Sequence, residues 1–195
     1  MIGSIDKRAY KVKVLDEKKI FGMKEFKLLP PISRHHIVEW VGHALEKKEG
    51  LIALRYFFVE TTLNGDDLGV YAIEEHFNKE LLENRKSREG IIFSAKSNQL
   101  KIFNEKKISK DINKRNQIRF LKTALQSVKN HEIGIDRIFD LEKFASHFAI
   151  IDLMDGYHAV SEQNALYYFN PITNLIEPIT REYNSLRYSE GQPYF

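Results

Sequence analysis

An Asn-Gly pair constrains the fold of this chain more than any other local feature. Asn64-Gly65 stands between residues 51–63, which are rich in β-branched and aromatic side chains, and the apolar run 70–73. Two extended segments joined through Asn-Gly are the strongest short-range signal for a β-hairpin, because Asn and Gly both tolerate positive φ. The sequence therefore predicts a hairpin over residues 51–73.

Further extended segments precede and follow this hairpin. Residues 10–14 alternate between polar and apolar side chains, and residues 26–28 repeat the pattern before Pro30-Pro31 ends it. A short strand is predicted at residues 91–93. Residues 165–169 and 175–179 enclose an Asn-Pro turn and form a second predicted hairpin.

Apolar side chains at helical spacing mark three longer helices. The first covers residues 34–48, the second is centred on residues 118–128, and the third follows the capping residue Asp140 and ends at Asp155-Gly156. A short helix is also expected after Phe77. We expect the large apolar side chains of the first and third helices to lie in the core, namely Trp40, Phe144 and Phe148.

The order of these elements, strands, helix, hairpin, helices and hairpin, predicts an α+β fold. A chain of 195 residues with 43% hydrophobic side chains buries a core without covalent help. Because the chain has no Cys, disulfides, thiolate nucleophiles and Fe–S clusters are excluded, and a metal would need carboxylate, amide or imidazole ligands. The absence of Cys leaves the cellular compartment open.

No apolar run approaches the ~20 residues that cross a bilayer. The first eight residues also lack the apolar segment of a secretory signal, so neither a signal peptide nor a transmembrane segment is predicted, and the localisation stays unknown.

Charge is distributed unevenly along the chain. Residues 96–122 carry nine bases and two acids, whereas residues 123–195 carry an excess of acids. A solvated loop and helix face explains the basic segment best. A nucleic-acid groove is the weaker explanation, because Phe103 and Phe120 are the only aromatic side chains there that could stack on bases.

The region from the third helix onward has the layout of a phosphoryl-transfer site. A carboxylate that orients the acceptor hydroxyl and an amide oxygen that holds Mg²⁺ are two of the groups this reaction uses. Asp155 and Asn164 are the candidates for these roles, and Lys13 with Glu39 is a candidate for the ion pair that positions the phosphates in kinases. Asp and Asn in loops also serve as turn formers and helix caps, so spacing alone leaves both readings open.

Two blocks of sequence resemble the CotH family, the atypical kinases named after spore coat protein H. The first is made of residues 20–28, 39–40, 43–45 and 49–56. The second, residues 63–77, is similar to the family's NGxxxGxYxLxE signature and is followed by Arg88-Glu89-Gly90. The resemblance is dense over residues 9–95 and thinner over residues 138–184. It implies an atypical protein kinase fold with ATP and Mg²⁺ or Mn²⁺ as cofactors.

The resemblance also implies roles for individual residues. Lys13, or Lys11 beside it, takes the place of the phosphate-contacting strand lysine, and Glu39 takes that of its helix partner. Glu74 and Glu75 fall at the hinge near an adenine.

In the second half of the chain, Asp155 matches the catalytic-loop aspartate and Asn164 the metal-binding asparagine. The family's further metal-binding aspartate falls where this chain reads Thr180-Arg181-Glu182. Glu182 is then the remaining candidate metal ligand, and Arg181 opposes cation binding there.

The same resemblance suggests a division of the chain. Residues 1–76 correspond to a small sheet-rich N-lobe, and residues 77–195 to the beginning of a C-lobe that includes the basic segment 96–122 and a catalytic-loop-like region 152–184. The phosphate-covering hairpin and most of the helical lobe have no counterpart, so the chain is expected to be a truncated member.

Two hypotheses about function remain. The first is ATP-dependent phosphoryl transfer to Ser or Thr of a protein substrate. The second is a non-catalytic module on the same fold that binds a coat, envelope or surface partner, for which Arg181 is the motivation. A nucleic-acid partner is the least favoured, and the oligomeric state is open.

Overall fold

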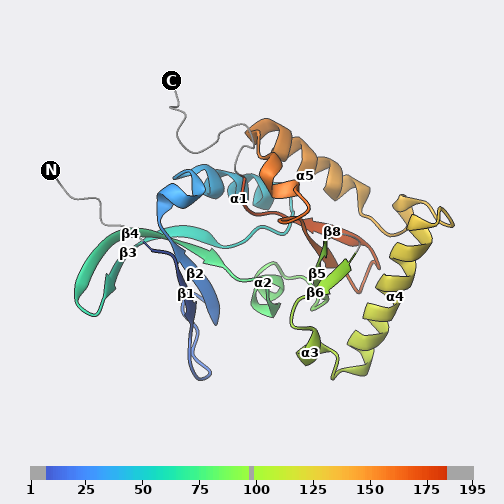
Figure 1. Cartoon of the computed structure of the whole chain (residues 1–195), viewed down its shortest axis with the longest axis horizontal. Coiled ribbons are helices and arrows are strands. Elements are labelled where there is room, and N and C mark those ends of the chain that lie inside the picture. Colours follow the sequence, from blue (N-terminus) through green and yellow to red (C-terminus); the bar gives the residue numbers. More distant parts are fainter. Residues whose placement is uncertain (1–7, 97–98, 184–195) are drawn as a thin grey trace.

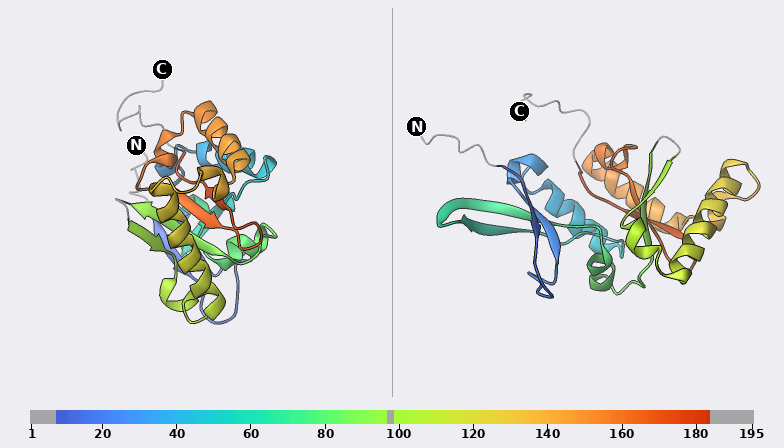
Figure 2. Two further views of the ribbon diagram at one scale, coloured as in Figure 1. Left: turned by 90° about the vertical axis from the view of Figure 1, so that its right-hand side faces the viewer. Right: turned by 60° about the horizontal axis from the view of Figure 1, so that its bottom comes forward.

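The computed structural model describes residues 8–96 and 99–183 and contains two four-stranded antiparallel sheets with helices packed against them (Figure 1). This arrangement confirms the predicted α+β class. The two sheets lie side by side, and the chain passes from the first to the second through α2 (Lys79–Asn84). Figure 2 shows the same arrangement from two other directions.

The first sheet has the strand order β1-β2-β4-β3. Its strands are β1 (Tyr10–Lys13), β2 (Glu25–Leu29), β3 (Tyr56–Leu63) and β4 (Asp66–Glu75). The predicted hairpin is confirmed, since β3 and β4 pair on either side of Asn64-Gly65, whose φ angles are 54° and 93°. The first strand of the hairpin begins at Tyr56 rather than at residue 51.

Residues 51–54 are buried and connect the two sheets. Ile52 forms an isolated parallel bridge with Ile179 of the second sheet. The apolar side chains of residues 51–54, which predicted a longer strand, therefore pack between the two sheets.

The second sheet has the strand order β6-β5-β7-β8. Its strands are β5 (Ile91–Lys96), β6 (Gln99–Ile102), β7 (Leu166–Phe169) and β8 (Ile176–Ile179). The predicted β7–β8 hairpin is confirmed. Strand β6 was not predicted, because its alternation is short and lies within the basic segment.

The three longer predicted helices are present, although the first begins at Val38 rather than at residue 34. Besides α2, the helices are α1 (Val38–Lys48), α3 (Glu105–Ile108), α4 (Ile112–Lys129) and α5 (Leu141–Met154), with 3-10 turns η1 (Pro31–Arg34), η2 (Ile135–Arg137) and η3 (Tyr157–Val160). The Asp140 side chain accepts a 3.2 Å hydrogen bond from the Lys143 N–H and caps α5 as predicted.

Helix α1 buries a different face from the one its apolar stripe predicts. Its buried side chains are Glu39, His43 and Glu46, next to the buried Gly42, whereas Trp40 is 48% exposed. The prediction that Trp40 lies in the core is wrong, and so is the one for Phe148, which is also 48% exposed. The reason is that the inner side of α1 has polar partners in the rest of the molecule.

Two apolar clusters connect the halves of the molecule. One joins Leu54 and Leu82 to Tyr168 of the second sheet, and the other places Tyr183 between α1 and α5. A Cβ added to Gly42 would lie 2.5 Å from the Tyr183 ring, so only glycine allows this close approach.

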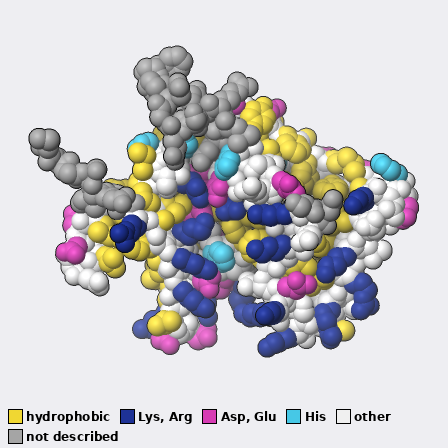
Figure 3. Space-filling model, viewed as in Figure 1, with side chains coloured by type: hydrophobic (Ala, Val, Ile, Leu, Met, Phe, Trp, Pro, Cys, Tyr) yellow, Lys and Arg dark blue, Asp and Glu magenta, His cyan; other side chains and the backbone are white. Residues whose placement is uncertain are grey.

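Lys and Arg side chains gather over β1 and β2 and over α3 and α4 on the face shown in Figure 3. The basic segment therefore forms a largely exposed surface around β6, α3 and the first half of α4. Among the described residues, no helix has the length and apolar character needed to cross a membrane.

Candidate functional site

Glu39 holds the segment that carries the last predicted metal ligand. Its side chain is fully buried, and its two carboxylate oxygens accept hydrogen bonds from the backbone N–H groups of Glu182 (2.7 Å) and Tyr183 (3.0 Å). His43, one turn further along α1, places Nε2 3.3 Å from Glu39 Oε1. Glu39 therefore fixes the backbone of residues 182–183 rather than a strand lysine.

The pKa of Glu39 reflects this environment. Burial by itself would raise the pKa, but the hydrogen bond and charge of His43, the Glu182 N–H and the charge of Arg34 together lower it below the ordinary value of 4.5. Glu39 is therefore ionised at neutral pH.

Glu182 is surrounded by two arginine side chains and one histidine side chain. Arg34 Nη2 lies 3.1 Å and Arg181 Nη1 2.8 Å from its Oε1, and His158 Nε2 lies 3.5 Å from its Oε2. The residue has a φ of 61°, a conformation that non-glycine residues rarely adopt. The carboxylate is thus already paired with two guanidinium groups.

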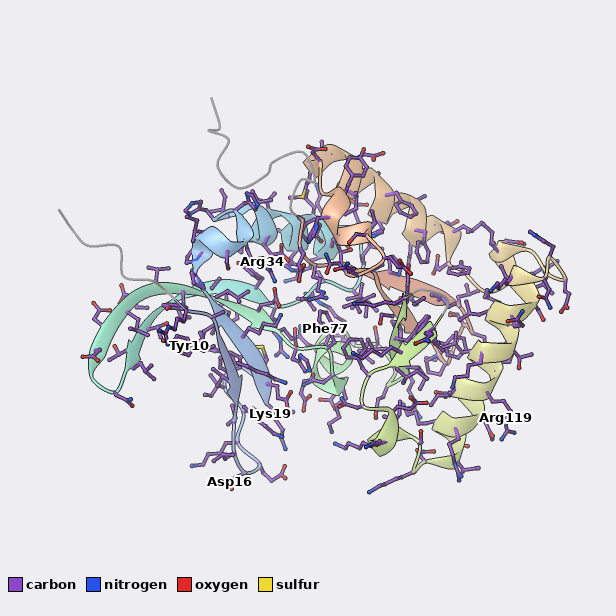
Figure 4. The ribbon with its side chains drawn as sticks, viewed as in Figure 1. Tyr10, Asp16, Lys19, Arg34, Phe77 and Arg119 are labelled. Atoms are coloured by element: carbon purple, nitrogen blue, oxygen red, sulfur yellow. The ribbon has the colours of Figure 1, made fainter. Side chains whose placement is uncertain are left out.

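Arg34 also reaches the first sheet. Its Nε lies 3.3 Å from Glu74 Oε2, and Lys27 Nζ lies 2.7 Å from Glu74 Oε1. Burial by itself would lower the pKa of Arg34, but the carboxylates of Glu74, Glu182 and Glu39 together raise it. The charged row Lys27, Glu74, Arg34 and Glu182 therefore runs from strand β2 to the segment after β8, as Figure 4 illustrates for Arg34 below α1.

Glu75, the second predicted hinge carboxylate, points to other partners. It is 1% exposed, accepts a 2.9 Å hydrogen bond from the Arg55 N–H and also pairs with the Arg55 guanidinium. Glu74 and Glu75 are therefore both occupied by cations of the chain itself.

The predicted ion pair between Lys13 and Glu39 does not form. Lys13 Nζ lies 3.6 Å and Lys11 Nζ 3.7 Å from the carboxylate of Glu25, the neighbouring residue on β2. Both lysines are on the edge strand β1 with largely exposed side chains, whereas Glu39 is buried beneath α1. Lys27, on the strand that directly precedes η1 and α1, is the lysine that contacts the buried Glu74.

Asp155 and Asn164 lie in one loop next to this row. Asp155 is the C-cap of α5 with a φ of 51°, and an added Cβ on the following Gly156 would lie 3.4 Å from the Tyr183 Cα. Asn164 is buried and donates a 3.2 Å hydrogen bond from Nδ2 to the His158 carbonyl. The loop thus abuts residues 180–183, with the Asn164 amide bracing it from inside.

Thr180, which stands in the predicted metal motif, belongs to a buried polar cluster. Its hydroxyl donates a 2.6 Å hydrogen bond to Glu46 and lies 2.7 Å from His147 Nδ1, which is itself 3.0 Å from Glu46 Oε1. This cluster ties α1, α5 and the end of β8 together.

A cavity of about 680 Å³ opens beside residues 76–78, the connecting segment between β4 and α2. We call it the large cavity. Its lining includes His76 and Phe77 of this segment, Lys13 of β1, and Phe103 and Lys107 near α3. The Phe77 ring lies 5.7 Å from that of Phe103 and 5.3 Å below the Arg181 guanidinium carbon. Phe77 thus connects the large cavity to the charged row, and Figure 4 shows it next to α2.

His76 directly follows Glu74 and Glu75, the two predicted hinge carboxylates, and lines the large cavity. Burial lowers the pKa of His76 below its ordinary value of 6.5, although Glu25, 3.6 Å away, acts in the opposite direction. The imidazole is therefore neutral at physiological pH and has one donor and one acceptor nitrogen.

These residues do not fit a divalent metal. Within residues 8–96 and 99–183, no three His, Asp or Glu side chains are grouped so that they could hold a metal ion. Glu182 is paired with two arginines, and a cation beside them would be repelled. The large cavity, in contrast, has the volume of a small-molecule site, and its lining combines two aromatic rings with four lysines and four carboxylates.

Two residues of this site, Lys27 and Arg34, and the contact between Arg181 and Phe77 were not predicted from the sequence. Lys27 could have been found by its place on the strand before the helix, where it shares a sheet face with Lys11. The role of Arg34 and the stacking of Arg181 on Phe77 could not be predicted from local sequence patterns, because the interacting residues are far apart in the sequence.

Comparison with known proteins adds one finding. A family model described as CotH kinase protein matches residues 2–183 of the 195-residue chain. No curated protein matches the chain.

Proposed function

Since the chain belongs to the CotH family, we propose that it binds a nucleotide such as ATP in the large cavity and acts as a binding module rather than as a metal-dependent phosphotransferase. One observation carries this proposal. Phe77, which lines the large cavity, lies under Arg181, and Arg181 together with Arg34 already neutralises the Glu182 carboxylate.

The lining of the large cavity suggests how a nucleotide would be held. The base would pack against Phe77 and Phe103, and neutral His76 would offer it a donor and an acceptor. The phosphates would lie towards Lys13 and Lys107, with lysine charges taking the part that a divalent metal has in the active kinases. Among the described residues, Lys107 has no ion-pair partner, so its charge is available to an anion.

A binding module needs a partner in place of a phosphoacceptor substrate. We infer that nucleotide occupancy between the connecting segment and β1 alters how the chain binds a coat, envelope or surface protein.

Ser/Thr phosphotransfer is the second candidate function. It is favoured by Asp155, whose loop packs against the Tyr183 backbone near Glu182.

Nucleotide binding can be tested by thermal unfolding of the whole chain. We expect ATP to raise the Tm equally with EDTA and with Mg²⁺ or Mn²⁺, because protein cations hold the phosphates. Lys13→Met should weaken ATP binding about tenfold, since it removes one charge-assisted contact. Lys11→Met is the matched control, because Lys11 is on the same strand and pairs with the same Glu25 but does not line the large cavity.

Label transfer from γ-labelled ATP separates the two candidate functions. Metal-dependent transfer to a protein Ser or Thr that is lost in both Asp155→Ala and Glu182→Gln would establish the phosphotransferase and overturn the binding module. The absence of any ATP-induced shift, with or without metal, would overturn nucleotide binding itself.

A further inference from the structure

A second, smaller cavity lies on another part of the molecule. It has a volume of about 290 Å³ and is enclosed by the C-terminal ends of α1 and α2, the start of α5 and the β7–β8 hairpin. Four basic side chains line it, and one carboxylate does: Lys47, Arg85, Lys86 and Lys143, with Glu177. None of these residues belongs to the large cavity or to the charged row.

The carboxylate of this small cavity is already satisfied. Glu177 is 3% exposed, its Oε2 lies 2.9 Å from Lys143 Nζ, and its Oε1 accepts a 2.8 Å hydrogen bond from the Asn170 amide. Lys143 and Glu177 therefore neutralise each other. Lys47, Arg85 and Lys86 remain as positive charges around the same space.

Arg85 is the most informative of these three cations. Its Nε donates a 2.7 Å hydrogen bond to the Ala53 carbonyl, which fixes the plane of the guanidinium group. Within the described part of the chain it has no carboxylate at ion-pair distance. Burial lowers the pKa of Arg85 and Arg55 acts in the same direction, while Glu75 only partly opposes them. A bound anion would relieve this unfavourable burial of charge.

Cations at helix ends offer a simpler explanation that covers only part of this arrangement. Lys47 lies in the last turn of α1 and Arg85 is the C-cap of α2, where positive side chains interact favourably with the helix dipole. Lys86 follows the helix with a φ of 55°, the left-handed conformation in which helices commonly end, so the helix terminus also explains its backbone. Helix dipoles do not explain, however, why two helix ends place their cations around one cavity.

We propose that the small cavity binds a phosphate group, either as inorganic phosphate or as a small phosphomonoester. A guanidinium held in a fixed plane offers parallel N–H donors to a tetrahedral oxyanion, and lysines add point charges. Asn84 and Ser87 line the same cavity and supply neutral donors. The volume is at the small end for ligand sites, which selects a phosphate on a compact organic group rather than a nucleotide.

Thermal unfolding of the whole chain at constant ionic strength tests this site. We expect sodium phosphate to raise the Tm in a saturable manner, and sodium chloride at equal ionic strength to leave it unchanged. Glycerol 3-phosphate and glucose 6-phosphate distinguish the two sources of the group. Tighter binding of an ester identifies a phosphomonoester site, and tighter binding of inorganic phosphate identifies a site for the free ion.

Two lysines in the last turn of α1 provide a matched pair. Lys47 lines the small cavity and Lys48 does not, so Lys47→Gln should weaken phosphate binding about tenfold while Lys48→Gln leaves it unchanged. Arg85→Gln should abolish the response. If that variant fails to fold because it loses the contact with Ala53, Lys86→Gln provides the second measurement.

The proposal is overturned if chloride reproduces the shift, or if Lys47→Gln and Lys86→Gln keep the affinity of the unsubstituted chain. It is independent of nucleotide binding in the large cavity. Lys13→Met should leave the phosphate response intact even where it weakens the response to ATP.

Discussion

At the scale of single residues, the buried carboxylates of this chain are bound by backbone groups and side chains of the chain itself. Glu39 receives two backbone N–H groups, Glu74 pairs with Lys27 and Arg34, and Glu46 binds Thr180 and His147. A buried charge is tolerated only when it is paired or hydrogen-bonded, and each of these carboxylates is.

Glu39→Gln should make the chain less stable at neutral pH. The amide keeps one acceptor oxygen but leaves one backbone N–H of residues 182–183 without its partner, which costs about 1–3 kcal/mol in the free energy of unfolding. Urea unfolding at pH 7 measures this loss.

The loss should shrink on acidification. Because the pKa of Glu39 is lower in the folded than in the unfolded chain, its stabilising contribution is complete above about 4.5 and disappears as the pH falls through the folded value. Glu49→Gln, at the exposed C-cap of α1, is the control and should show neither effect. Equal stabilities of Glu39→Gln and the unsubstituted chain at pH 7 would contradict this role.

At the scale of elements, α1 shows how tertiary contacts override a helical stripe. Residues at the apolar positions Ile37 and Trp40 are exposed, and the opposite face with Glu39, His43 and Glu46 is inside. Periodicity located the helix correctly because either face gives the same period. It could not identify the buried face, which depends on polar partners from α5 and from residues 180–183.

Trp40, the single Trp of the chain, should behave as a partly hydrated indole. We expect its fluorescence in the folded state to be quenched readily by acrylamide and to change little on unfolding. Trp40→Ala should cost less than about 1 kcal/mol, well below the 3–5 kcal/mol of a buried aromatic side chain. A blue-shifted emission that is protected from the quencher would show that α1 buries its apolar stripe after all.

At the scale of the whole molecule, the two sheets are joined by a few long-range contacts. Arg34 connects Glu74 of the first sheet to Glu182 after the second, and the apolar cluster around Tyr183 joins α1 to α5. This position makes Arg34 both a link between the halves and the reason that Glu182 does not fit a metal. We expect the contact between Arg34 and Glu182 both to stabilise the fold and to keep Glu182 from binding a metal ion.

A double-mutant cycle on Arg34→Met and Glu182→Gln should give a coupling free energy of about 1–3 kcal/mol, because both side chains are largely buried. Chemical denaturation of the four proteins in the cycle measures it. The exposed pair Lys24 and Glu17, 2.8 Å apart, is the matched control and should couple more weakly, because solvent screens both charges. Equal coupling in the two cycles would mean that Arg34 is not a structural link.

The sequence by itself determined the local structure and the family. The Asn64-Gly65 turn, the Asp140 cap and the β7–β8 hairpin depend on neighbouring residues, so they could be predicted from local patterns. The CotH resemblance and the unusual Thr180-Arg181-Glu182 were likewise visible without coordinates.

The tertiary structure decided which charges meet. The pairings of Glu39 with residues 182–183 and of Arg34 with Glu182 join groups more than 140 residues apart, and Lys13 found its carboxylate on the adjacent strand instead. A local pattern cannot choose between such partners, because Coulomb energy depends on distance and burial in the folded chain. The small cavity, proposed as a phosphate site, likewise depends on tertiary contacts that bring Lys47, Arg85 and Lys86 around one space.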